Sequence, residues 1–151
     1  MNNYSNPSAK TYKGVSQVLR QLFSSAAWST DAGLLILRLS CGLMALHGWD
    51  KFVDFSSGAA DFPDPFHIGS PISKGLTVFA ELFCTLLLLI GLYTRLALIP
   101  LVICLFVIVF VIHGEDPLGD KEHAILYLAP YLTLMLTGPG KYSLDSWLRK
   151  V

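Results

Sequence analysis

Four apolar segments, each close to the length needed to cross a bilayer, dominate the sequence. They run over residues 32–52, 71–93, 96–113 and 122–137. A helix rises about 1.5 Å per residue, so about 20 apolar residues span the hydrocarbon core of a membrane. The sequence therefore predicts an all-α polytopic membrane protein, built as an antiparallel bundle of four transmembrane helices.

The composition excludes several other classes of protein. Of the 151 residues, 53% are hydrophobic and only 15% are charged, whereas soluble globular domains are about one quarter charged. Four spans leave room for tails and loops but not for a separate soluble domain. The formal net charge is zero, so no overall basic field attracts a phosphate backbone, and nucleic acid is not an expected partner.

The N-terminal region differs from the rest of the chain. Residues 1–30 are polar and contain no long apolar run, but residues 15–28 place several apolar side chains on one helical face. This pattern favours a short amphipathic helix lying on the membrane surface. We therefore expect two parts: a cytoplasmic tail over residues 1–30 and a four-span membrane domain over residues 31–148.

The distribution of basic residues orients the predicted bundle. With both termini on one side, seven basic residues of the tails and loops lie on that side and three on the other. The positive-inside rule then places both termini in the cytoplasm. The expected location is the bacterial inner (cytoplasmic) membrane. The basic residues on the cytoplasmic side are Lys10, Lys13, Arg20, Arg95, Lys141, Arg149 and Lys150.

Two ionisable residues lie within the predicted spans. Arg38 is about two turns into the first span, and Glu81 is near the middle of the second. Their predicted depths differ by about 5 Å, so we expect them to form an ion pair. Ionisable groups at membrane depth are costly and often functional. The pair could lock the two spans together, hold a polar ligand or relay protons, and the sequence leaves these roles open.

A second polar cluster is expected near the outer ends of the spans. His47 and Lys51 are four residues apart and share a helical face, His113 ends the third span, and Glu122 and His123 open the fourth. Such a cluster suits a small polar headgroup, for example a quinone ring whose carbonyl oxygens accept hydrogen bonds. The alternative is that these residues are polar because span ends touch water. Their spacing does not indicate a metal site.

The cysteines do not indicate redox chemistry of their own. Cys41, Cys84 and Cys104 all lie within predicted spans and form no Cys-x-x-Cys motif. Thiol oxidoreductases need two neighbouring, accessible cysteines, so we interpret these three as packing residues. We expect no covalent cofactor.

Several short motifs follow one another along residues 31–148, and together they resemble the DoxX family of four-helix membrane proteins. The C-terminal motif is the most specific of them. The motifs are Leu35-Ile36-Leu37-Arg38-Leu39, His47-Gly48-x-x-Lys51, Phe79-Ala80-Glu81, Gly91-Leu92-Tyr93-Thr94-Arg95, His113 and Gly138-Pro139-Gly140-Lys141-Tyr142-Ser143-Leu144-Asp145.

The resemblance implies more about fold than about function. The family is named after a subunit associated with thiosulfate:quinone oxidoreduction, and relatives are linked to membrane redox complexes. By this resemblance, Arg38, His47, Lys51 and Glu81 are the family's polar positions. Distant relatives with the same four-span plan act as cargo receptors or assembly chaperones, without redox chemistry.

Two functional hypotheses follow. The first is a quinone- or lipid-headgroup-interacting subunit of a membrane redox system, at most an oxidoreductase subunit that acts with a partner protein. Its candidate ligand-binding residues are Arg38, His47, Lys51, Glu81, His113, Glu122 and His123. The second is a non-catalytic scaffold, assembly factor or chaperone-like partner. A transporter would require oligomerisation, and small residues in the first span permit the close helix contacts of a homodimer.

Overall fold

A computed structural model describes residues 29–149 of the chain. Every regular element in this part is helical, so the predicted all-α class is confirmed there. The chain divides into two units after Thr30, and the fold below is that of the second unit. The amphipathic helix expected at residues 15–28 lies outside the described residues.

Three stretches of helix are long and apolar enough to cross a membrane: Thr30–Val53, Ser70–Ile90 and Thr94–Ile112. Each end lies within three residues of the corresponding predicted span. All three are interrupted or locally widened. The first span consists of α2 (Thr30–Cys41) and α3 (Met44–Val53). The second consists of α5 (Ser70–Val78), the π-helical η1 (Phe79–Cys84) and α6 (Thr85–Ile90). The third consists of α7 (Thr94–Val107) and the π-helical η2 (Ile108–Ile112).

The fourth long helix, α8 (Leu118–Thr137), begins four residues before the predicted fourth span. Its first turns carry Asp120, Lys121 and Glu122, so it is less apolar than the other three and is not among the candidate spans. A fourth crossing therefore stays a prediction. Two short helices complete the described elements: α4 (Phe55–Gly58) and α9 (Leu144–Leu148).

Large apolar side chains cover much of the outer surface of these helices. They are exposed to between about one third and four fifths of their full area, and they include Ile36, Leu46, Phe106, Phe110, Leu126 and Leu136. Soluble monomers rarely expose contiguous apolar surface on this scale. If the same surface faces lipid instead of water, exposing these apolar side chains has no hydrophobic cost. Together with the three candidate spans, it identifies a helical membrane protein that contacts lipid.

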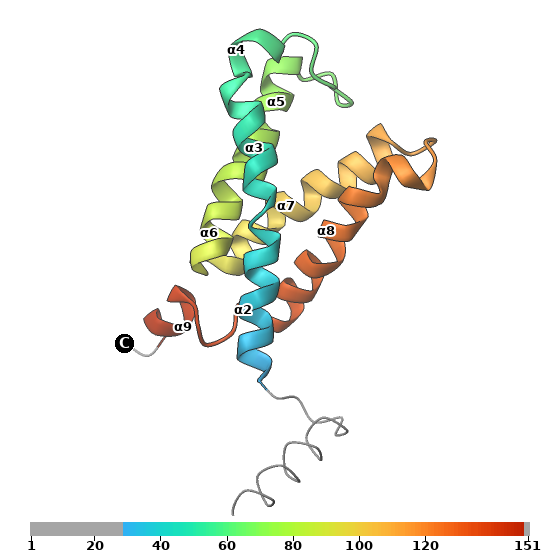
Figure 1. The fold of residues 1–151 in the computed structure, drawn as a ribbon. Coiled ribbons are helices and arrows are strands. Elements are labelled where there is room, and N and C mark those ends of the chain that lie inside the picture. The colour runs from blue at the N-terminus through green and yellow to red at the C-terminus, as the bar shows by residue number, and fades with distance from the viewer. Residues whose placement is uncertain (1–28, 150–151) are drawn as a thin grey trace, which may run out of the picture. The chain divides into compact units, whose positions relative to one another are not determined.

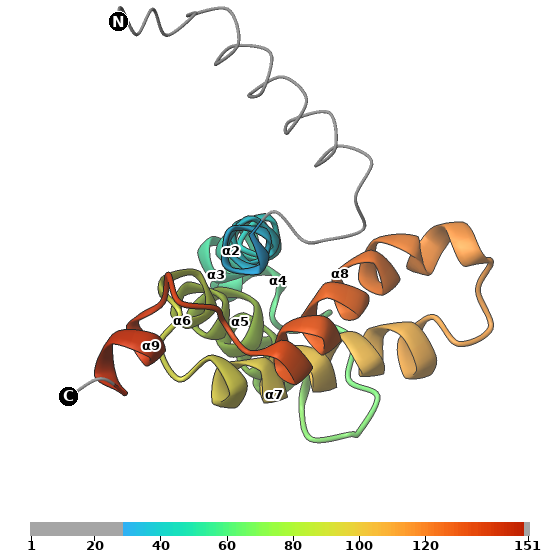
Figure 2. The same cartoon turned by 90° about the horizontal axis from the view of Figure 1, so that it is seen from below.

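Consecutive long helices are antiparallel neighbours. α6 and α7 contact each other and are joined by a turn at residues 91–93, as the sequence predicts. Gly91 caps α6 in the left-handed conformation (φ +69°), which glycine adopts without a steric penalty. α7 and α8 also run side by side in opposite directions (Figures 1 and 2).

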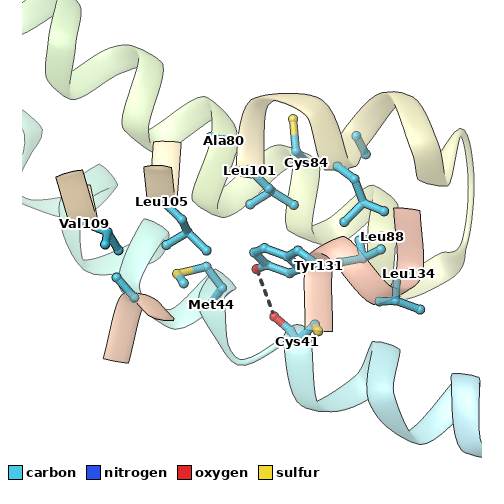
Figure 3. Close-up of a cluster of buried hydrophobic side chains, with 13 residues drawn as sticks. Cys41, Met44, Ala80, Cys84, Leu88, Leu101, Leu105, Val109, Tyr131 and Leu134 are labelled. Atoms are coloured by element: carbon cyan, nitrogen blue, oxygen red, sulfur yellow. Dashed lines mark hydrogen bonds between the residues drawn. The ribbon is translucent and has the colours of Figure 1, made fainter. Parts of the chain in front are cut away.

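The core lies where α2 and α3 meet η1, α6, α7 and α8. Tyr131 of α8 is fully buried at its centre, and its hydroxyl donates a hydrogen bond to the carbonyl oxygen of Cys41 at 3.4 Å (Figure 3). Met44, Leu88 and Leu105 are among the buried side chains around it. Cys41 and Cys84 are also buried here and form no disulfide, in agreement with their interpretation as packing residues.

Candidate functional site

The candidate site begins with Glu81, which lies in the π-helical segment η1. A π-helical turn contains one more residue than an α-helical turn, and such turns are frequent at functional sites. α-Helix continues on both sides of η1, in α5 and α6. The Glu81 side chain is only 3% exposed. A carboxylate buried to this extent needs a charged or hydrogen-bonding partner.

Gly48 brings α3 close enough to supply that partner. A Cβ atom at Gly48 would lie 2.5 Å from the backbone nitrogen of Leu82 and 2.7 Å from the carbonyl carbon of Glu81. Only a residue without a side chain permits this approach. Lys51 follows one helical turn later, on the same side of α3. The His47-Gly48-x-x-Lys51 motif therefore delivers an ammonium group to the widened turn of the second span.

Lys51 and Glu81 form an ion pair. The Lys51 Nζ donates a hydrogen bond to the Glu81 Oε2 at 2.6 Å. The Lys51 side chain remains 30% exposed, so it borders open space while its ammonium is bonded to the carboxylate. An ammonium carries three donor protons and Glu81 takes one of them. At least one N–H is therefore free to bind another group.

The open space beside Lys51 is a large cavity between the second and third spans, here named the apolar cavity. Its volume is about 560 Å³, within the usual range for small-molecule sites. Its lining is mostly aliphatic and aromatic, with a few polar groups. The lining residues are Lys51, Phe62, Pro63, Pro65, Phe66, Ile68, Ser73, Leu76, Thr77, Phe79, Ala80, Pro100, Ile103, Cys104, Val107, Ile108, Ile112 and His113.

The connection between α4 and α5 forms one wall of the apolar cavity, and Asp64 holds its shape. The Asp64 carboxylate accepts hydrogen bonds from the backbone N–H groups of Ile68 and Gly69 and from the Ser73 hydroxyl, at 3.1, 2.7 and 2.8 Å. Desolvation opposes ionisation, but these bonds together hold the pKa of Asp64 below its ordinary value. The connection thereby lies beside the third span (Figure 1), and its Phe62 and Pro63 share the cavity lining with residues of that span.

His113 contributes a second nitrogen-bearing side chain to the cavity lining. It follows η2 directly, and its Nδ1 lies 2.7 Å from the Asp116 Oδ2. The Lys121 ammonium donates to the carbonyl oxygens of His113 and Gly114, at 3.0 and 2.9 Å. These contacts fix the end of the third span. The cavity therefore has histidine and lysine residues within a mostly apolar lining.

A second, polar cavity adjoins the first and is here named the vestibule. It has a volume of about 400 Å³ and is open on one side. The buried Lys74 donates to the carbonyl oxygen of Asp54 at 2.7 Å, and its ammonium lies 3.6 Å from the Asp54 Oδ2. A hydrogen bond from Ser57 and the charge of Lys74 lower the pKa of Asp54. The vestibule is lined by Asp50, Lys51, Asp54, Gly58, Asp61, Phe62, Pro63 and Lys74.

The predicted Arg38–Glu81 ion pair is wrong, because Glu81 pairs with Lys51. Arg38 lies at the other end of the core and is 2% exposed. Its guanidinium donates to the carbonyl oxygen of Tyr142, close to Gly91 and to the carboxylate of Asp145. It therefore holds the C-terminal segment against the turn between α6 and α7 and does not line the apolar cavity.

The structure brings together only part of the predicted outer cluster. Lys51 and His113 line the apolar cavity, and Glu81 is bonded to Lys51. His47 is exposed, and its ring faces Tyr127 edge-on with the centroids 6.5 Å apart. Glu122 and His123 are exposed on α8 and line neither cavity. Among residues 29–149, no three His, Cys, Asp or Glu side chains are grouped so as to hold a metal ion.

Sequence reasoning missed the connection between α4 and α5 as part of the site. The apolar residues Phe62, Phe66 and Ile68 in an otherwise polar segment were a usable signal, because such side chains seek a packing partner. Thr77 and Cys104 were also missed as lining residues. In sequence they are ordinary members of apolar helices, and only the placement of the third span identifies their role.

Comparison with known proteins places this fold and site in a family. Residues 33–114, just over half of the chain, match DoxX. The chain belongs to the DoxX family. The match begins within α2 and ends just after η2, and it therefore contains Lys51, Glu81, His113 and every residue that lines either cavity.

The DoxX match is accompanied by similarity to a bacterial relative. An uncharacterized protein of Haemophilus influenzae is 29% identical, over 81% of this chain and 87% of its own length. The similarity therefore extends beyond the residues of the family match. No solved structure matches the chain.

Proposed function

We propose that this DoxX-family protein is a quinone- or lipid-headgroup-binding subunit of a membrane redox system. The apolar cavity holds the ring or chain of the ligand, and Lys51 and His113 hold its polar head. The observation that carries the proposal is the Lys51–Glu81 pair beside a mostly apolar cavity of about 560 Å³.

The chemistry of the lining supports this class of ligand. A quinone or a lipid has an apolar body that matches the aliphatic and aromatic lining, and a head whose oxygens accept hydrogen bonds. Lys51 has N–H groups beyond the one given to Glu81, and its charge strengthens such a bond. Glu81 neutralises the ammonium, so that a neutral head can bind without leaving an unpaired charge at membrane depth.

The proposal divides the redox work between the ligand and a partner. A bound quinone would supply the electron-accepting and electron-donating chemistry, while this chain binds, orients and hydrogen-bonds it. The side chains that would hold it are Lys51 and His113, with Glu81 positioning Lys51. Electrons would then come from or go to a separate protein of the same membrane.

We also propose a four-span arrangement in a bacterial inner membrane with both termini in the cytoplasm. The excess of basic residues on the side of the termini supports this orientation. The Asp145 carboxylate accepts hydrogen bonds from the backbone N–H groups of Tyr93 and Thr94, at 2.7 and 2.8 Å. Since that turn joins the second and third spans, α8 returns the chain to the same end.

The test is to purify the protein in lipid nanodiscs and to identify what it retains. We expect mass spectrometry of the extract to show a quinone or one lipid class near one molecule per protein. His113→Ala and Glu81→Gln should each lower its occupancy severalfold. His123→Ala and Glu122→Gln are the matched controls, because these residues line neither cavity, and they should retain the ligand.

Two outcomes would reject the proposal. One is a protein that contains only bulk lipid, and the other is equal occupancy in His113→Ala and His123→Ala. In either case the non-catalytic scaffold becomes the better hypothesis. It predicts that charge reversal in the acidic connections, at residues 50–64 and 115–120, abolishes association with a partner protein while Glu81→Gln has little effect.

A further inference from the structure

The apolar cavity and the vestibule meet at a shared set of residues. Lys51, Phe62 and Pro63 line both. Lys51 is the charged member of this set, and its ammonium is bonded to the buried Glu81. The same side chain therefore faces a polar space on one side and an apolar space on the other.

The vestibule has the properties of a water-filled entrance. Asp50, Asp54 and Asp61 are exposed and contribute three carboxylates to its lining. The ammonium of Lys74 is held by Asp54, and that of Lys51 by Glu81. Ionised side chains of this density remain hydrated, and their position at the ends of α3 and α5 places them where the first two spans reach water.

Beyond Lys51, in the direction of Arg38, the packing is close. Glu81 is 3% exposed, and Gly48 brings α3 into backbone contact with η1. The next residues along this direction are the buried core around Met44 and Tyr131 (Figure 3). Water that reaches Lys51 from the vestibule therefore meets an apolar barrier before the other end of the molecule.

We propose that Lys51 is the junction at which the ligand's polar head exchanges protons with water, from the Asp54 end of the bundle alone. The route runs from the vestibule past Phe62 to the Lys51 ammonium. The identity of the ligand rests on the proposed function above. The one-sided access of water to Lys51 does not depend on it.

The proton step uses groups that the structure places together. When the ligand is a quinone and the separate redox partner has reduced it, an oxygen of its head carries negative charge and takes a proton from the Lys51 Nζ, so that an N–H bond breaks and an O–H bond forms. The resulting amine takes a proton from a water molecule in the vestibule, which restores the ammonium and leaves hydroxide in that water. The electrons come from the partner, and none moves in the proton step itself. Glu81 keeps Nζ in place throughout, and a ligand proton is thereby drawn from one compartment.

The test measures from which side a charged reagent reaches this junction. Cys41, Cys84 and Cys104 are replaced by alanine, and single cysteines are introduced as Lys51→Cys or Phe62→Cys. Phe62→Cys keeps the Lys51–Glu81 pair intact, so it covers the case in which Lys51→Cys misfolds. Asp61→Cys reports the vestibule side, and the exposed Arg95→Cys reports the opposite side, at the start of α7.

Sealed vesicles of each orientation are treated with a positively charged, membrane-impermeant methanethiosulfonate. The cysteine thiolate attacks the reagent, forms a mixed disulfide and releases methanesulfinate, so modification requires a cysteine that has lost its proton to water. We expect Lys51→Cys and Phe62→Cys to react from the side on which Asp61→Cys reacts, at least about tenfold faster than from the Arg95→Cys side. Reaction from the Arg95→Cys side, or from neither side, would overturn the proposal.

A second pair of variants distinguishes the two cavities. Gly58 lines the vestibule, and the atoms nearest to a Cβ added there belong to the flexible ends of Asp54 and Lys74. Gly58→Leu should therefore slow modification of Phe62→Cys about tenfold. Leu76→Phe narrows the apolar cavity alone and should leave the rate unchanged. If Phe62→Cys were modified at equal rates in the Gly58→Leu and Leu76→Phe variants, the reagent would reach residue 62 by another route, and the proposal would be overturned. One-sided labelling of a protein that retains neither a quinone nor one lipid class would reject the proposed function and leave this route standing.

Discussion

At the scale of single residues, the closeness of α3 and η1 depends on Gly48. The space for a Cβ atom is occupied by backbone atoms of Glu81 and Leu82, which cannot move aside as a flexible side chain can. The Lys51–Glu81 distance of 2.6 Å is a consequence of this approach. Gly33 in α2 is a natural comparison, because a Cβ atom added there would have no neighbour within 4 Å.

We expect Gly48→Ala to lower the free energy of unfolding by about 1–3 kcal/mol, because an added methyl group forces two packed helices apart. Gly33→Ala should be neutral or raise it by about 0.5–1 kcal/mol, as alanine does in a helix interior. Unfolding by a denaturing detergent, followed by circular dichroism, gives both values. If the two variants were equally stable, close packing at Gly48 would not hold the pair together.

The partner of Glu81 was the residue-scale feature that sequence reasoning predicted incorrectly. Depth along a span can be counted from the sequence, and by depth Arg38 was a suitable partner. The direction in which a side chain points around the helix axis, and therefore which neighbouring helix it faces, cannot be obtained by counting residues. Arg38 is instead bonded to Tyr142, 104 residues further along the chain, whereas Gly48 brings Lys51 to Glu81.

At the scale of elements, the C-terminal segment 138–149 is attached to the turn between α6 and α7. The Asp145 carboxylate accepts from Tyr93 and Thr94, and the Asp145 N–H donates to the Gly91 carbonyl oxygen at 2.8 Å. Desolvation opposes ionisation of this carboxyl, but its hydrogen bonds lower its pKa from 3.8. The ionised form is therefore the one that holds the segment.

This pKa predicts how stability depends on pH. A carboxyl whose pKa is lowered on folding contributes stability in full above its unfolded value and loses it as the pH falls through the folded value. For Asp145 the loss begins below about pH 3.8. Asp145→Asn should be less stable than the unsubstituted protein at pH 7, and the difference should shrink below pH 3.8. Unfolding midpoints at about pH 7, 4 and 3 provide the test.

The exposed Glu115→Gln is the matched control for this measurement. It removes one carboxylate in the connection before α8 and should leave the midpoint at pH 7 unchanged. A difference between Asp145→Asn and the unsubstituted protein that persists undiminished at pH 3 would show that the segment is held by other contacts.

The π-helical segments η1 and η2 are elements that could not be predicted from the sequence. An apolar run has the same composition whether its turns are α-helical or contain the extra residue of a π-helix, so hydropathy finds the span but not its register. The C-terminal segment is the most specific motif of the DoxX resemblance. Its contact with the turn at residues 91–93 nevertheless depends on tertiary structure that no local pattern contains.

At the scale of the whole molecule, the apolar segments predicted the three candidate spans to within three residues at each end, because span length follows from bilayer thickness. The apolar cavity could not be predicted in this way. It exists because the connection between α4 and α5 lies beside the third span, and connections carry little periodic signal. Lys51 and His113 were proposed from their position at span ends, and the cavity joins them.

The number of crossings is the remaining prediction at this scale. α8 has 20 residues, which as a helix extend about 30 Å, the thickness of the hydrocarbon core. Its start follows the third span, and the segment after it is bonded to the turn at residues 91–93. If the second and third spans cross the membrane, that turn and the start of α8 lie on opposite sides, so α8 must cross as well.

Single cysteines test this arrangement with an impermeant thiol reagent on sealed vesicles, in the chain without its native cysteines. Asp61→Cys and Glu115→Cys should react from one side only, and Arg149→Cys from the other. Arg95→Cys is the control, because it follows the turn to which the C-terminal segment is attached, and it should react on the same side as Arg149→Cys. Reaction of Arg149→Cys on the side of Glu115→Cys would instead mean that α8 lies along the membrane surface, and the hydrogen bonds of Asp145 could not then form.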